Sequence, residues 1–158
     1  MCILFLFYNK ILYYSYTTLG DVMRVRYRDV DVDVLGRIMR AEAIGEGMFG
    51  MKLVGNVVVN RVVYKCKPFK KITTVYDAVM QEKQFEGTTI KLFTSQATSK
   101  ERKLALDCIK FWRAEPAYSA LYFQNPGKGK PCKKDWYGIL QGRFRNHCFY
   151  DPEKLCNL

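Results

Sequence analysis

Glu42 stands out because it continues an apolar stripe. It follows Leu35 by seven residues, Ile38 by four and Met39 by three, so a helix over this stretch would turn its carboxylate toward the core. A carboxylate that loses solvation has a raised pKa, and a carboxylic acid that stays protonated near neutral pH is what general-acid cleavage of a glycosidic bond requires. The spacing therefore indicates a candidate catalytic acid. The alternative is a glutamate that reaches solvent and falls on the stripe by chance.

Glu46 lies about one helical turn beyond Glu42. On a continuous helix the two carboxylates would be close together, which disfavours their joint ionisation and raises one pKa further. Glycines at positions 45, 47 and 50 surround Glu46 and would let the backbone approach a bound chain closely. We expect Glu46 to support the same site.

Aromatic residues crowd the last third of the chain, from Trp112 to Tyr150. Aromatic faces stack on sugars and on nucleic-acid bases alike, although most of these rings are expected in the core. The side-chain amides of Gln84, Asn125 and Asn146 lie near aromatic residues in the sequence and suit hydroxyl or N-acetyl groups. These residues are compatible with a carbohydrate site without proving one.

Length and charge limit the class of protein. The chain has 158 residues, of which 49% are apolar, and this fits one globular domain rather than a disordered chain. No apolar run approaches the ~18 residues that a membrane span needs. There are 26 Lys and Arg against 15 Asp and Glu, a net charge of +11, which predicts an anionic partner: nucleic acid, a membrane surface or an acidic cell-wall polymer.

Histidine and cysteine are too few or wrongly spaced for several kinds of site. His147 is the only histidine, so chemistry that needs two histidines on one metal is excluded, and no CxxC motif is present. We expect neither a metal nor another cofactor. Cys132, Cys148 and Cys156 cluster late in the chain, where they could pair under oxidising conditions or serve as small buried apolar residues.

The pattern of residues predicts a single α+β domain. Carboxylates from Asp29 to Asp33 suit the start of a helix that contains Glu42, and capping boxes begin at Thr74 and Thr98. The predicted elements are a helix behind Asp29–Asp33, a buried helix or strand over 51–64, a short helix from Thr74 to about Met80, a mixed segment over 81–93 with a β-prone end, a helix from Thr98 to about Arg113, a strand over 118–123, a loop over 125–131, and short β-like pieces up to Tyr150.

Several motifs in one order resemble the SleB/CwlJ family of cell wall hydrolases, the spore cortex-lytic enzymes of endospore-forming bacteria. The motifs are MRAEAIGE at 39–46, the stretch from Gly50 to Asn60-Arg61, QFE at 84–86, ALYFxNP at 120–126, DWY at 135–137, FRNHCFY at 144–150, and Cys156. The ending is more similar to the CwlJ branch. The resemblance covers residues 29–158.

The resemblance implies a lysozyme-like domain, mainly helical with a small antiparallel sheet, that cuts peptidoglycan glycan strands. It implies Glu42 as the catalytic residue and a substrate-binding group made of Glu46, Gln84, Phe85, Tyr122, Asn125, Trp136 and His147. Lytic transglycosylation needs one carboxylate, whereas an ordinary hydrolase needs a second one, about 5–5.5 Å away for retention or about 6.5–9.5 Å away for inversion. We therefore favour transglycosylation, with Glu46 as the second carboxylate if the reaction is hydrolysis.

Residues 1–28 are expected to be an extension outside this domain. The apolar stretch from Cys2 to Tyr8 has no charged region before it and no clear cleavage site, so we expect no cleaved signal peptide. The resemblance implies a place in the spore coat, at its boundary with the cortex, and coat proteins as possible partners. Two alternatives are a catalytically silent coat protein and a basic nucleic-acid-binding domain, although no nucleic-acid motif is present.

Overall fold

The computed structural model describes residues 23–134 and 136–153. The predicted extension therefore lies mostly outside the described residues. Its described end contacts the domain, because the Arg24 guanidinium donates to the side-chain oxygens of Asn56 and Asn60. No helix in these ranges is both long and apolar enough to cross a membrane.

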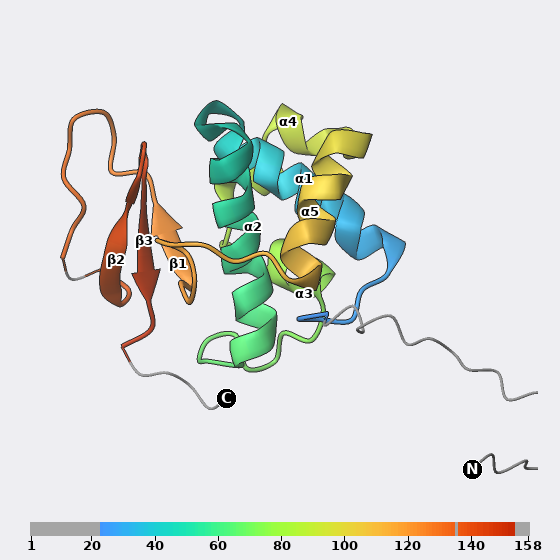
Figure 1. Ribbon diagram of the computed structural model, residues 1–158, viewed down its shortest axis with the longest axis horizontal. Coiled ribbons are helices and arrows are strands. Elements are labelled where there is room, and N and C mark those ends of the chain that lie inside the picture. Colours follow the sequence, from blue (N-terminus) through green and yellow to red (C-terminus); the bar gives the residue numbers. More distant parts are fainter. Residues whose placement is uncertain (1–22, 135, 154–158) are drawn as a thin grey trace, which may run out of the picture.

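The helices form one layer and the strands another, and α2 is the helix that lies next to the sheet (Figure 1). The helical elements are α1 (Asp29–Ala43), the 3-10 turn η1 (Ile44–Glu46), α2 (Gly47–Tyr64), α3 (Val75–Met80), the 3-10 turn η2 (Glu86–Thr89), α4 (Lys91–Thr94) and α5 (Ser99–Lys110). The prediction of β structure at the end of the 81–93 segment is wrong, because Lys91–Thr94 forms a short helix that packs against α1.

The start of α1 is stabilised by a carboxylate, as the sequence predicted. Asp31 is buried, and its side chain accepts the backbone N–H of Arg28 at 2.8 Å and that of Tyr76 at 2.8 Å. One carboxylate therefore satisfies a donor at the beginning of α1 and another at the beginning of α3. The two predicted capping boxes at Thr74 and Thr98 are also present, at the starts of α3 and α5.

The sequence of segment 51–64 allows either a helix or a strand. In the structure it is helical, as part of α2, and it lies at the centre of the domain. Leu53, Val54, Val57 and Val58 in α2 are all 0% exposed. Two groups of partners bury them: Val54 and Val58 pack with α1 and α5, whereas Leu53 and Val57 pack with Phe149 on the sheet side. A helix enclosed from both sides can be apolar around its circumference, which overrides the β propensity of its valines.

Within the described residues, three antiparallel strands form the sheet, in the order β1-β3-β2. They are β1 (Tyr122–Gln124), β2 (Ile139–Phe144) and β3 (His147–Asp151). The predicted strand over 118–123 is thus shorter and begins later, and the late β-like pieces form the hairpin β2–β3. In Figure 1 the edge strand β1 faces α2, and the loop that joins β1 to β2 runs along the far side of the sheet.

Candidate active site

A cleft of about 640 Å³ lies between the helical layer and the sheet. The end of α1, the segment before η2, strand β1 and the segment before β2 all contribute to its walls. The structure brings together Glu42 and all but one of the predicted binding residues, which are Gln84, Phe85, Tyr122, Asn125, Trp136 and His147. The exception is Glu46.

Glu42 occupies the end of α1 with its side chain in the cleft. Its Oε1 accepts the backbone N–H of Gly87 at 2.6 Å. Burial raises the pKa of Glu42, and the negative charge of Glu86 raises it further, whereas the Gly87 N–H and the Arg61 guanidinium act in the opposite direction. The net result is a carboxylic acid that holds its proton to a higher pH than usual, as the apolar stripe predicted.

Arg61 is the main residue of the site that sequence reasoning did not single out. It is 4% exposed, and its Nε donates to the backbone carbonyl of Leu121 at 2.9 Å. Its guanidinium carbon lies 4.5 Å from the centre of the Phe69 ring and 4.6 Å from that of the Phe85 ring. Burial lowers the pKa of Arg61 to about 10, so the side chain remains a fixed positive charge beside Glu42 at neutral pH.

A signal for Arg61 was available in the sequence. It follows Val57 by four residues and Val58 by three, so it continues an apolar stripe in the same way as Glu42 does. A charged residue at such a position is a site candidate whether it is an acid or a base. Other cleft residues that were not predicted are Pro68, Lys83, Glu86, Phe123, Gln124 and Tyr137.

Glu46 does not lie one helical turn beyond Glu42, and it is not among the residues that line the cleft. Helix α1 ends at Ala43, and the chain turns through η1 before α2 begins at Gly47, whose φ of 74° favours glycine. The acidic neighbour that raises the pKa of Glu42 is Glu86 rather than Glu46.

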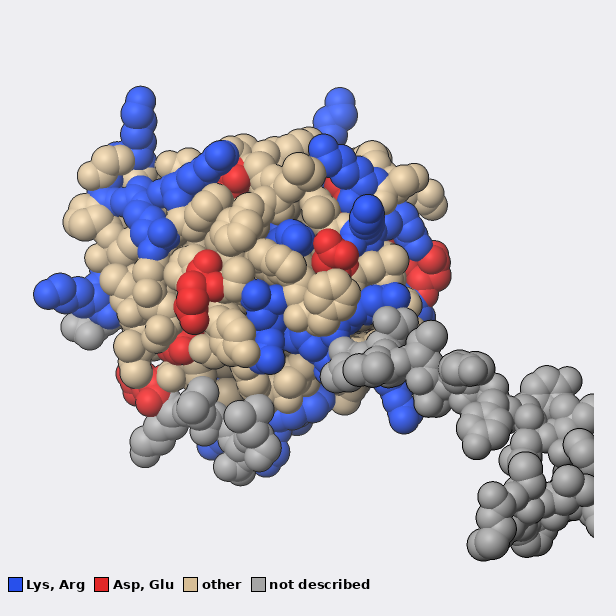
Figure 2. Space-filling model, in the orientation of Figure 1, with Lys and Arg blue, Asp and Glu red and all other residues tan. Residues whose placement is uncertain are grey.

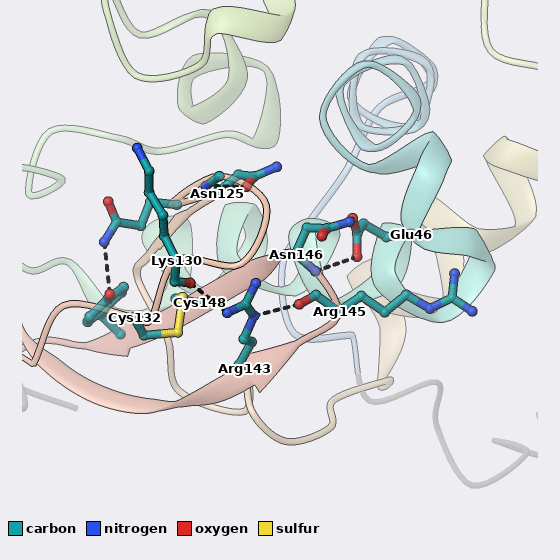
Figure 3. The surroundings of a disulfide bond; sticks show 11 residues. Glu46, Asn125, Lys130, Cys132, Arg143, Arg145, Asn146 and Cys148 are labelled. Atoms are coloured by element: carbon teal, nitrogen blue, oxygen red, sulfur yellow. Dashed lines mark hydrogen bonds between the residues drawn. A yellow bond between two sulfur atoms is a disulfide. The ribbon is translucent and has the colours of Figure 1, made fainter.

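Glu46 points instead to the turn of the β2–β3 hairpin (Figure 3). It is 5% exposed, and it accepts hydrogen bonds from the backbone N–H of Asn146 at 3.2 Å and from the Asn146 amide at 2.8 Å. Its Oε1 also lies 3.9 Å from Nδ1 of His147, which does line the cleft. Burial lowers the pKa of His147, and the Glu46 charge opposes that effect. Glu46 therefore holds the hairpin that carries His147.

Aromatic side chains form one wall of the cleft. Tyr122 and Tyr137 stack with ring centres 5.6 Å apart, and Trp136 meets Tyr137 edge-on at 4.7 Å. Phe85 lies across from Phe123, with ring centres 6.1 Å apart. Exposed ring faces beside side-chain amides are suited to the apolar faces and hydroxyl groups of sugars.

A disulfide joins the β1–β2 loop to β3. Cys132 is bonded to Cys148, which directly follows the cleft residue His147 (Figure 3). Of the two alternatives for these two cysteines, the structure has the pair, whereas Cys156 lies outside the described residues. Within those residues, no group of three or more His, Cys, Asp or Glu side chains is arranged to hold a metal ion.

Comparison with known proteins identifies the family. The sequence profile described as Cell Wall Hydrolase matches residues 45–150, about two thirds of the chain. The chain belongs to the Cell Wall Hydrolase family. The matched segment contains the cleft residues from Arg61 to His147. Glu42 lies just before the matched segment. The assignment of Glu42 to the cleft therefore rests on the geometry described above.

Curated relatives agree with that assignment. Cell wall hydrolase CwlJ of Halalkalibacterium halodurans is 43% identical over 130 residues, which cover 81% of this chain and 90% of the relative. Cell wall hydrolase CwlJ of Bacillus subtilis is 42% identical over 130 residues, which cover 81% and 89%. The resemblance to the SleB/CwlJ family that the motifs predicted is confirmed.

Two solved structures share the fold. The catalytic domain of the germination-specific lytic transglycosylase SleB from Bacillus anthracis aligns with a TM-score of 0.63 at 24% identity, covering 79% of this chain and 97% of that chain. The catalytic domain of the Bacillus cereus SleB protein gives a TM-score of 0.65 at 24% identity and covers 81% and 96%. The predicted lysozyme-like α+β domain, mainly helical with a small antiparallel sheet, is confirmed.

Proposed function

We propose that this cell wall hydrolase cleaves the glycan strands of spore cortex peptidoglycan during germination, with Glu42 as the general acid. The observation that carries the proposal is the position of Glu42: a carboxyl group with a raised pKa, in a cleft walled by aromatic rings and side-chain amides. The names of the relatives support the substrate. CwlJ proteins are cell wall hydrolases, and one structural neighbour is a germination-specific lytic transglycosylase.

The proposed reaction begins with proton transfer from Glu42 to the oxygen that links N-acetylmuramic acid to N-acetylglucosamine. The bond between that oxygen and C1 of the muramic residue breaks, and the leaving sugar keeps the proton. The Glu42 carboxylate then removes the proton of the muramic C6 hydroxyl, whose oxygen bonds to C1. This step regenerates the acid and produces a 1,6-anhydro ring, so lytic transglycosylation needs one carboxylate.

The remaining cleft residues have proposed roles in holding the glycan. Tyr122 and Trp136 offer ring faces to the sugars, and Phe85 lies across from Phe123 in the same cleft. Gln84 and Asn125 offer amides to hydroxyl and N-acetyl groups, and His147 contributes a neutral imidazole at neutral pH. Arg61 limits how far the pKa of Glu42 rises.

Hydrolysis is the competing reaction, and Glu86 is the carboxylate on which it would depend. Glu86 lines the cleft and acts electrostatically on Glu42, whereas Glu46 is committed to Asn146. Hydrolysis by two carboxylates predicts that Glu86→Gln loses most activity. Transglycosylation through Glu42 alone predicts that Glu86→Gln retains it, with a lower pKa of Glu42 because one negative neighbour is gone.

Mass spectrometry of the products tests the proposal. Purified cortex fragments are digested with the wild-type chain, and the released glycans are analysed. Transglycosylation predicts muramic ends that are lighter by one water molecule than the reducing ends that hydrolysis leaves. Reducing ends alone would refute transglycosylation, and the absence of any released glycan would refute the enzyme assignment.

The proposed location is the spore coat, at its boundary with the cortex. The similarity to the CwlJ cell wall hydrolases and the proposed substrate, the cortex, support this location. Fractionation of spores with an antibody against the chain would test it, because recovery from the spore core would contradict the proposal.

A further inference from the structure

Positive charge is concentrated at the sheet end of the molecule. Residues 29–115 contain 15 Lys and Arg and 11 Asp and Glu, whereas residues 116–150 contain six and one. The six are exposed and lie on the β1–β2 loop and the β2–β3 hairpin; they are Lys128, Lys130, Lys133, Lys134, Arg143 and Arg145. We call these six residues the basic arm. Blue side chains project from the left edge of the molecule in Figure 2, where this loop lies.

The basic arm has no acidic partner in the described part of the chain. None of its residues takes part in an ion pair there. The arginines on α1 and α5 differ in this respect, because Arg37, Arg40 and Arg102 each pair with an aspartate or a glutamate. Six neighbouring cations repel one another, and an anion bound among them would relieve that repulsion.

The fold holds the arm in place. The disulfide between Cys132 and Cys148 fixes the loop to β3. Nη1 of Arg143 donates to the Lys130 carbonyl at 2.8 Å, and its Nε donates to the Arg145 carbonyl at 2.6 Å (Figure 3). A loop that is already ordered loses less conformational entropy when it binds a partner.

The arm is continuous with the cleft. Asn125 lies at the start of the β1–β2 loop and Trp136 near its end, and both line the cleft. A polymer that lies in the cleft therefore leaves it beside the lysines. Peptidoglycan carries free carboxylates on its peptide substituents, outside the glycan that the cleft would hold.

We propose that the basic arm is a second binding surface, which holds the carboxylates of the peptide substituents while the glycan lies in the cleft. The proposal rests on the proposed function, since it takes peptidoglycan as the polymer. Net charge alone would attract these carboxylates to the whole surface of the protein. The proposal assigns the attraction to the lysines and arginines of this loop and hairpin.

Two triple variants test the proposal by co-sedimentation with purified cortex peptidoglycan, both made in the Glu42→Gln background so that the polymer is not consumed. K128S/K130S/K133S removes three charges from the arm. K91S/K100S/K103S removes three exposed charges from α4 and α5, neither of which lines the cleft. Each exposed charge attracts an anion only weakly, so removing three together predicts roughly tenfold weaker binding for the arm variant and less than about twofold for the control.

Amidation of the peptidoglycan carboxylates identifies the ligand. The parent chain should bind amidated polymer roughly tenfold more weakly than native polymer, and the arm variant should discriminate less than about twofold. Equal effects of the two triple variants, or equal binding of native and amidated polymer by the parent, would overturn the proposal. Loss of duplex DNA binding in the arm variant, with peptidoglycan binding intact, would also overturn it and assign the arm to nucleic acid.

Failure of the proposed function would look different. A wild-type chain that binds peptidoglycan through the arm but releases no glycan would contradict the enzyme assignment and leave the arm as a binding surface. A chain that releases glycan with an arm variant indistinguishable from the control would refute the arm alone.

Discussion

Gly87→Ala should strongly reduce catalytic activity. Among the side chains proposed to contact substrate, the new methyl group meets only that of Glu42. A Cβ at residue 87 would lie 2.6 Å from Oε1 of Glu42, 3.0 Å from its Cδ and 3.0 Å from Cβ of Ala41. Normal contacts between such atoms are about 3.5 Å. The methyl group therefore forces the Glu42 carboxylate back by roughly 1 Å, on the side from which the Gly87 N–H now reaches it.

The expected magnitude follows from that displacement. A misplacement of about 1 Å can lower turnover by about a hundredfold. The hydrogen bond from Gly87 to the Glu42 carboxylate is weakened as well, and a bond to a charged group contributes about 1.5–3 kcal/mol. That bond lowers the pKa of Glu42, so its loss lets burial raise the pKa further. If protonated Glu42 is the active form, the alkaline fall in activity should move to higher pH.

Turnover of cortex fragments as a function of pH measures both effects. The matched control is Gly45→Ala, because a Cβ at Gly45 meets no atom within 4 Å. We expect wild-type activity and an unchanged pH profile for Gly45→Ala. A Gly87→Ala variant that is as active as Gly45→Ala, with the same alkaline limb, would refute the placement of the catalytic acid.

Three further predictions concern the supports of the cleft. Arg61→Met should lower the free energy of unfolding by about 2 kcal/mol, because it leaves a buried carbonyl without its donor; an unchanged urea midpoint would contradict this. Replacing Cys132 and Cys148 by serine should lower it by about 3 kcal/mol, since the disulfide closes a loop with a sequence separation of 16; identical denaturation curves would count against the bond. Glu46→Ala removes the acceptor of Asn146 and should reduce both stability and turnover, whereas full activity would show that the hairpin needs no such contact.

The sequence was informative where one residue departed from a local pattern. Glu42 on an apolar stripe predicted a carboxyl group with a raised pKa, and burial at the end of α1 produces that result. Arg61 has the same spacing to Val57 and Val58, which indicates burial but not a function. Its partners are a backbone carbonyl and aromatic rings from distant segments, so its role could not be read locally.

Glu46 shows where periodicity alone misleads. Its spacing from Glu42 suggested a shared face, but the helix ends at Ala43 and the turn sends Glu46 to a hairpin 100 residues away in sequence. The break at Ala43 (φ −140°, ψ 19°) and the turn that ends at Gly47 (φ 74°) change the direction of the side chains that follow. The contribution of Gly87 was equally hidden, because it depends on the space between η2 and α1 rather than on any neighbour in sequence.

The rate at which the Glu42→Gln variant releases glycan from cortex peptidoglycan tests the central claim most directly. Glutamine keeps the shape and can still accept the Gly87 N–H, but it has no proton to give. We predict a folded variant that binds the polymer and releases glycan at least about a hundredfold more slowly than wild type. A variant with the wild-type rate would show that Glu42 is not the acid.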